Sequence, residues 1–127
     1  MKINDPDVVA EVEAAFARYE RALLSNDVDT LTALFWKSPL TIRYGIGEIL
    51  YGSDEIAAFR GARSPVGLAR ELSRTAITTY GDDFATASTL FHRVTVPGKV
   101  GRQMQSWVRL PEGWRIVAAH VSLIDES

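Results

Sequence analysis

Two polar side chains, Tyr19 and Arg43, lie in apolar surroundings, where their chemistry would be protected from water. A free phenol has a pKa of about 10, so little of it is ionised at neutral pH. A guanidinium within about 4–6 Å lowers that pKa and raises the phenolate fraction. The guanidinium could instead bind a carboxylate through two parallel hydrogen bonds. These residue types therefore suit a pocket for a small anion, with acid–base chemistry at the phenol.

Three further side chains could complete such a pocket. Trp36 and Trp107 offer aromatic surface that could position a substrate, and the imidazole of His120 could move a proton near neutral pH.

Each of these five residues also has an ordinary structural interpretation. Tyr19 lies on the apolar face of a predicted helix, where a core tyrosine needs one hydrogen-bond partner. Arg43 could be an edge-strand arginine that faces water. His120 could be a core histidine with its hydrogen bonds satisfied, and Trp36 and Trp107 could belong to the core. The residues alone therefore indicate a domain with polar groups that could line a pocket.

Several kinds of site are excluded by what the sequence lacks. The chain has no cysteine, which removes thiol nucleophiles and thiolate metal sites. His92 and His120 are far apart in sequence, and neither has an Asp or Glu two to four residues away. The glycines Gly45 and Gly47 resemble the start of a dinucleotide-binding loop, but Leu50 replaces its third glycine, so we expect a hairpin turn. We expect no metal and no cofactor.

Length and composition predict one domain over residues 1–127. The chain is 46% hydrophobic with a formal net charge of −2, so it offers no broad basic surface for nucleic acid or for an acidic membrane. The first residues lack the apolar segment of a signal peptide, and no apolar run is long enough to span a bilayer. We therefore expect a cytoplasmic protein.

The first half of the chain has the pattern of three helices and two short strands. Apolar residues recur at helical spacing between residues 8 and 23, after Asp5 as a cap. Asp27 can cap a second, short helix, and Ser53 a third. Two strands at 40–44 and 48–51 are expected between the second and third helices.

The second half of the chain has the pattern of four antiparallel strands. Turn signals at 80–83, 97–99 and 111–113 divide residues 68–125 into segments joined by short connections. Strict alternation in the last strand assigns one face to Trp114, Ile116, Ala118, His120 and Ser122.

Both faces of these strands are largely apolar, so both should be covered. Helices packed on a curved antiparallel sheet would cover one of these faces, which is an α+β arrangement. A second copy of the chain is the simplest cover for the other, and we expect a homodimer that buries the outer face of residues 84–124.

Three segments carry a family resemblance that spans residues 5–125: YERALLSNDVDTLTALFW, TIRYGIGEILYGSDEIAAFR and SWVRLPEGWRIVAAHVSL. They resemble the AtzH-like family of the SnoaL-like (nuclear-transport-factor-two-like) superfamily. The resemblance implies a cone-shaped fold, in which three N-terminal helices pack on a strongly curved antiparallel sheet. It also implies a pocket inside the cone and dimers formed through the sheet.

The resemblance implies an activity as well. It points to a cofactor-free, decarboxylating amidohydrolase that acts on 1,3-dicarboxyurea, with a tyrosine on the first helix and an arginine on the first strand as the catalytic pair. Tyr19 and Arg43 match those positions. Trp36, Trp107 and His120 would then bind a small anionic substrate.

Two other functions stay open. One is a non-catalytic ligand-binding or dimerisation module of the same fold, and the other is an isomerase or cyclase of the wider superfamily, whose usual pocket carboxylate has no evident counterpart here. Polar groups converging in a pocket would favour a small-molecule site, whereas a pocket filled by apolar side chains would favour a protein–protein module.

Overall fold

Carboxylate caps fix the starts of the first two helices. The computed structural model describes residues 1–126. Helix α1 (Pro6–Leu24) begins after Asp5, whose carboxylate accepts a hydrogen bond from the backbone N–H two residues on at 3.0 Å. Helix α2 (Val28–Leu34) begins after Asp27, which accepts from the N–H three residues on at 3.1 Å. Both caps are as predicted, and each satisfies a donor that the helix leaves free.

The third helix begins differently from the prediction. Helix α3 (Ser53–Ala62) follows Gly52, which has a φ of 89° and no capping side chain. Ser53 is therefore the first helical residue, and its assignment as the cap was wrong. Its hydroxyl instead accepts a hydrogen bond from the backbone N–H of Ser38 at 2.9 Å, which ties the start of α3 to the segment before the first strand.

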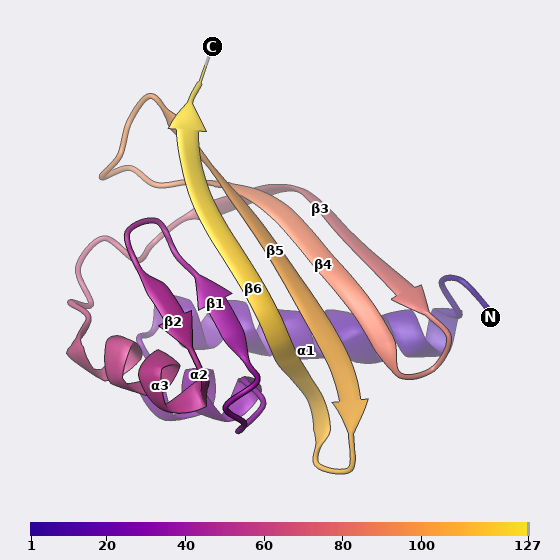
Figure 1. Cartoon of the computed structure of the whole chain (residues 1–127). Helices are drawn as coiled ribbons and strands as arrows, with labels where there is room; N and C mark the ends of the chain where they lie inside the picture. The colour runs from indigo at the N-terminus through magenta and orange to yellow at the C-terminus, as the bar shows by residue number, and fades with distance from the viewer. Residues whose placement is uncertain (127) are drawn as a thin grey trace.

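The strands form one six-stranded sheet in the order β2-β1-β6-β5-β4-β3 (Figure 1). Its members are β1 (Ile42–Tyr44), β2 (Ile49–Tyr51), β3 (Glu71–Tyr80), β4 (Phe84–His92), β5 (Lys99–Leu110) and β6 (Gly113–Asp125). The last four strands form the predicted antiparallel meander, and β1 and β2 form the predicted hairpin. The hairpin joins the sheet by a parallel pairing of β1 with β6, which the sequence pattern did not indicate.

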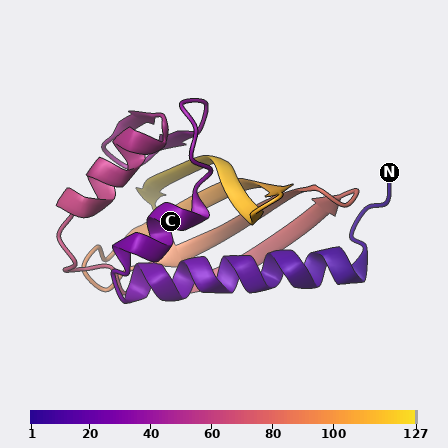
Figure 2. The same ribbon diagram turned by 90° about the horizontal axis from the view of Figure 1, so that it is seen from below.

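The helices cover one face of this curved sheet (Figure 2). Helix α1 packs against β3, α2 against β6, and α3 against β2. The core lies between the two layers, as expected for an α+β fold. No helix within residues 1–126 is long and apolar enough to cross a membrane.

A β-bulge in β6 changes which residues of that strand face the helices. Ser106 pairs with Ala118 while Trp107 pairs with Ile116, so the residue between those two partners, Val117, is an extra one. One inserted residue exchanges the two faces of a strand beyond it, because side chains alternate with a period of two.

The bulge makes the predicted alternation of β6 wrong beyond Val117. Trp114 and Ile116 are buried as predicted, but Ala119 and Val121 take the inner positions that follow. His120 is consequently exposed on the outer face of the sheet, where its ring lies 6.1 Å from that of Tyr44.

Candidate active site

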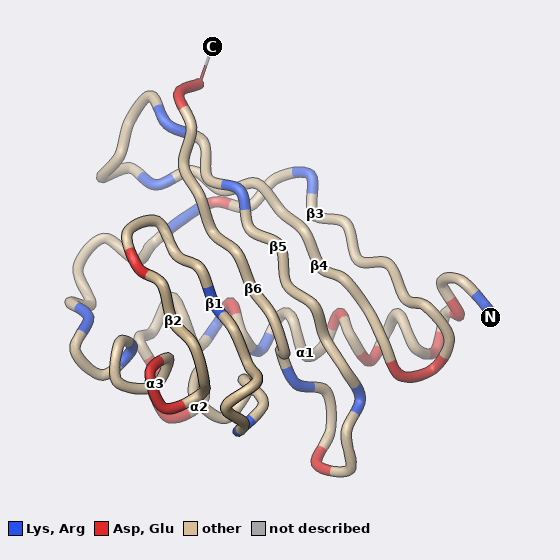
Figure 3. Tube along the Cα trace, in the orientation of Figure 1, with Lys and Arg blue, Asp and Glu red and all other residues tan. Residues whose placement is uncertain are grey.

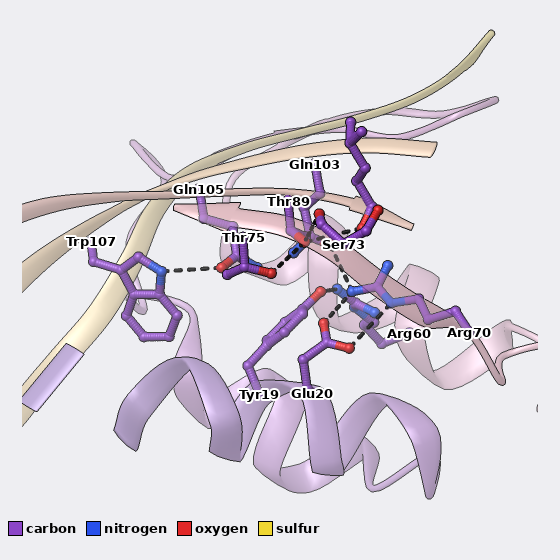
Figure 4. A network of polar contacts seen from close by, with 11 residues as sticks. Tyr19, Glu20, Arg60, Arg70, Ser73, Thr75, Thr89, Gln103, Gln105 and Trp107 are labelled. Atoms are coloured by element: carbon purple, nitrogen blue, oxygen red, sulfur yellow. Dashed lines mark hydrogen bonds and ion pairs between the residues drawn. The ribbon is translucent and has the colours of Figure 1, made fainter. Parts of the chain in front are cut away.

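Tyr19 enters the core from the buried face of α1 and is 2% exposed. Its hydroxyl accepts a hydrogen bond from Nη2 of Arg60 at 2.7 Å (Figure 4). Because Arg60 donates to the phenol oxygen, the phenol's own proton is not used in this contact. Tyr19 therefore has one satisfied lone pair and a hydroxyl proton that a ligand could accept.

Arg60 reaches this phenol because it lies one helical turn after the buried Ile56 on α3. It is fully buried, and its guanidinium carbon lies 5.6 Å from the ring centroid of Tyr19 and 5.7 Å from that of Phe35. Its Nε and Nη1 atoms have no hydrogen-bond partner among the described residues. Buried donors without acceptors are unfavourable, so an acceptor at these two nitrogens would stabilise the guanidinium.

The surrounding charges lower the pKa of Tyr19. Burial alone would raise that pKa, but the positive charges of Arg60, Arg43 and Arg70 and the hydrogen bond from Arg60 outweigh it, so the pKa lies below its usual value. The core thus holds a phenol that gives up its proton more readily than a free tyrosine.

Arg43 faces the interior, so the interpretation as a water-facing edge residue was wrong. It is 6% exposed, and Nη1 donates to Oε1 of Glu48 at 2.6 Å. The same guanidinium lies 5.3 Å from the ring centroid of Phe59, and its Nε has no partner among the described residues. Gly45 permits this ion pair, since a Cβ there would lie 1.6 Å from the Glu48 oxygen.

Arg70 forms the second buried ion pair of the region. It donates from Nε to Oε2 of Glu20 at 3.2 Å and from Nη2 to the other oxygen of that carboxylate, a bidentate arrangement. Its Nη2 also donates to Oε1 of Gln103 at 3.0 Å (Figure 4). The negative charge of Glu20 is thereby neutralised by Arg70.

A cavity of about 290 Å³ opens beside these residues. Arg43, Arg63, Arg93, Glu48 and Phe59 are among the residues that line it. Figure 3 shows basic positions on β1, in α3 and in the loop after α3 at the same end of the molecule. Arginines that converge on a cavity favour a small anion as its occupant over an apolar packing surface.

The five predicted site residues are only partly brought together. Tyr19 and Arg43 lie within electrostatic reach, but the direct hydrogen bond to the phenol comes from Arg60, and Tyr19 does not line the 290 Å³ cavity. Trp107 is fully buried in the same core cluster as Tyr19, and its indole N–H donates to Oε1 of Gln105 at 3.1 Å.

Trp36 and His120 lie elsewhere, so placing them in this pocket was wrong. Trp36 lines a separate cavity of about 400 Å³ between α2, α3 and the β5–β6 turn. His120 lies on the opposite face of the sheet because of the bulge in β6.

The residue pattern did not predict five further charged residues of this region: Arg60, Arg63, Arg70, Arg93 and Glu48. One signal could have revealed Arg60, namely its spacing of four residues from Ile56 on a predicted helix face. No comparable signal existed for Arg63, Arg70 and Arg93, which precede or follow regular elements and reach the site through the tertiary fold.

No group of three His, Cys, Asp or Glu side chains that could hold a metal ion occurs within residues 1–126.

Comparisons with known proteins agree with this fold. A family model described as AtzH-like matches residues 1–127. A crystal structure of a protein of unknown function from the DUF3225 family of Pectobacterium atrosepticum is 60% identical, with a TM-score of 0.94, over 97% of this chain and 95% of that one. A cystatin-like fold protein from Burkholderia xenovorans is 53% identical, with a TM-score of 0.96, over 100% and 99% of the two chains.

A more distant neighbour is an NTF2-like superfamily protein from Salmonella enterica serovar Typhimurium, 27% identical with a TM-score of 0.72 over 96% and 93% of the two chains. No curated protein matches the chain.

Proposed function

This chain belongs to the AtzH-like family, and we propose that it is a cofactor-free hydrolase that removes a carboxylate from a small N-carboxylated urea such as 1,3-dicarboxyurea. The observation that carries the proposal is the buried phenol of Tyr19, which accepts a hydrogen bond from Arg60 at 2.7 Å and does not use its own proton in that contact. The arginines that line the neighbouring cavity support a dianionic substrate, since a monoanion would leave more of their charge unmatched.

The reaction needs one proton on the nitrogen that loses its carboxylate. The C–N bond to one carboxylate of 1,3-dicarboxyurea breaks, and its electron pair stays on the nitrogen. That nitrogen takes the proton of Tyr19, and CO2 and allophanate are released. Water then returns a proton to the phenolate, and hydration of CO2 gives bicarbonate. Tyr19 is therefore the general acid of the step.

The charges around Tyr19 suit this role. Donation of the proton leaves a phenolate in the core, and the guanidiniums of Arg60, Arg43 and Arg70 stabilise it, as the lowered pKa of Tyr19 reflects. Arg43 has a free Nε to hold a substrate carboxylate. Because Tyr19 is 2% exposed, the buried arginines rearrange when the substrate enters.

The activity is tested by incubating the purified protein with 1,3-dicarboxyurea and measuring the CO2 released. We expect Arg43→Lys to lose most of the activity, because an ammonium cannot reproduce the fixed fork of donors that holds both Glu48 and a substrate carboxylate. Arg21→Lys, on the exposed side of α1, is the matched control and should keep it. Full turnover by Arg43→Lys would remove that arginine from the mechanism.

A homodimer through the outer face of residues 84–124 is part of the same proposal. The outer surface of the sheet exposes Met104 by 58%, Phe84 by 39% and Tyr44 of β1 by 38%. A hollow of about 310 Å³ lies among these strands and could receive side chains of a second copy.

We expect a sedimentation mass of twice 14.0 kDa at micromolar concentration. Met104→Glu should shift the protein to the monomer, because it places a charge on the apolar interface. Val94→Glu changes a residue that is 94% exposed in the loop after β4 and should leave the dimer intact. A wild-type mass of 14.0 kDa would refute the dimer.

A further inference from the structure

Two arginines at the cavity, Arg63 and Arg93, have no role in the proton transfer described above. Both are about half-buried and line the 290 Å³ cavity together with Arg43. Arg63 follows the end of α3, and Arg93 follows the end of β4, so different elements bring them to one wall.

Aromatic rings hold both guanidiniums in place. The guanidinium carbon of Arg63 lies 5.8 Å from the ring centroid of Phe59, and that of Arg93 lies 5.2 Å from the ring centroid of Phe91. Contacts of this kind orient an arginine without using its N–H donors. The donors therefore stay free for a ligand.

Several of those donors have no acceptor. Nε and Nη2 of Arg63 and Nε of Arg93 are buried without a hydrogen-bond partner among the described residues. Burial, followed by the charges of Arg60 and other arginines, lowers the pKa of Arg63 to about 10. The pKa of Arg93 is lowered by burial and then by the charges of Arg70 and Arg43. An anion bound here would relieve both the missing hydrogen bonds and the repulsion.

The carboxylates in this region do not supply that anion. Glu48 is paired with Arg43 and Glu20 with Arg70, and no ion pair to Arg60, Arg63 or Arg93 exists within residues 1–126. Two half-buried guanidiniums thus remain at the cavity without a matching negative charge, and the buried guanidinium of Arg60 is unmatched within the core. A ligand with two carboxylates neutralises this excess of positive charge more fully than a ligand with one.

We propose that Arg63 and Arg93 form a second carboxylate subsite, which binds the carboxylate that the reaction retains and makes the site selective for dicarboxylates. This inference rests on the proposed function, since it assigns the two ends of the same substrate. The carboxylate that is lost then lies toward Tyr19, Arg60 and Arg43, and the retained one lies at the wall formed by the other two arginines.

Binding of an unreactive analogue tests the subsite without any turnover. Glutarate has three atoms between its carboxylates, as 1,3-dicarboxyurea does, and butyrate is the same chain with one carboxylate removed. Isothermal titration calorimetry of both probes would be carried out with the wild-type protein, Arg63→Gln, Arg93→Gln and the exposed control Arg21→Gln.

We expect the wild-type protein to bind glutarate at least about tenfold more tightly than butyrate. Arg63→Gln and Arg93→Gln should each weaken glutarate about tenfold or more while leaving butyrate within about twofold, and Arg21→Gln should change neither. Glutarate affinity that is unchanged in both variants, or equal binding of the two probes by the wild-type protein, overturns the subsite. Circular dichroism confirms that each variant is folded. Because the two substitutions lie after different elements, either variant still tests the subsite if the other misfolds.

Failure of the subsite and failure of the proposed function give different results. If glutarate binding depends on Arg63 and Arg93 but 1,3-dicarboxyurea is not turned over, the subsite stands and the activity fails. If 1,3-dicarboxyurea is turned over with the same KM in both variants, the activity stands and the subsite is overturned.

Discussion

Tyr19→Phe is expected to lower kcat for 1,3-dicarboxyurea by at least about a hundredfold, since general acid–base groups contribute roughly 10²–10⁴. The change removes one oxygen and its proton and keeps the aromatic ring that packs against Phe35 at a centroid distance of 6.4 Å. KM should change much less, because the carboxylates of the substrate are bound by arginines. Steady-state measurement of CO2 release gives both constants.

Tyr80→Phe is the matched control, because it removes the same atoms from a tyrosine at the end of β3. Its kcat should equal that of the wild-type protein. Wild-type turnover in Tyr19→Phe would leave Tyr19 as a packing residue and remove the phenol from the mechanism.

Arg60→Gln is expected to have the next largest effect, through the acidity of the phenol. Arg60 donates the hydrogen bond to Tyr19 and is the largest of the charges that lower the pKa of Tyr19. Its loss should raise that pKa and reduce kcat at neutral pH by about tenfold or more, since a weaker acid donates its proton less readily.

The pH dependence separates this effect from simple damage to the fold. The protonated phenol is the active form, so kcat should fall as pH rises through the pKa of Tyr19, which lies below its usual value in the wild-type protein. In Arg60→Gln this fall should move to higher pH, and in Arg60→Lys, which keeps the charge, it should move less. An unshifted profile in Arg60→Gln would show that Arg60 does not act through the phenol.

Local rules were sufficient for the starts of the first two helices and for the candidate phenol. Asp5 and Asp27 cap helices as predicted because a carboxylate satisfies nearby backbone donors without help from the rest of the fold. The helical spacing that places Tyr19 on the buried face of α1 is equally local.

The charged surroundings of Tyr19 and Arg43 could not be predicted from local sequence rules. Glu48 reaches Arg43 through a hairpin turn, and Arg60 reaches Tyr19 from another helix. Such contacts depend on tertiary packing, which residue spacing does not encode.

One inserted residue in β6 makes the face predicted for His120 wrong. Strict alternation along β6 predicts it on the same face as Ile116, and the extra residue at Val117 moves it to the other face. The strand is apolar on both sides of the bulge, so the sequence contains no change of pattern that marks the insertion.

A spectrophotometric titration measures directly whether arginines hold the pKa of the buried Tyr19 phenol below its usual value. Tyrosinate absorbs in the near ultraviolet, so the titration of the wild-type protein minus that of Tyr19→Phe isolates this one group. We expect a difference curve whose midpoint lies below about 10, the value of a free phenol. A midpoint at or above that value would contradict this expectation.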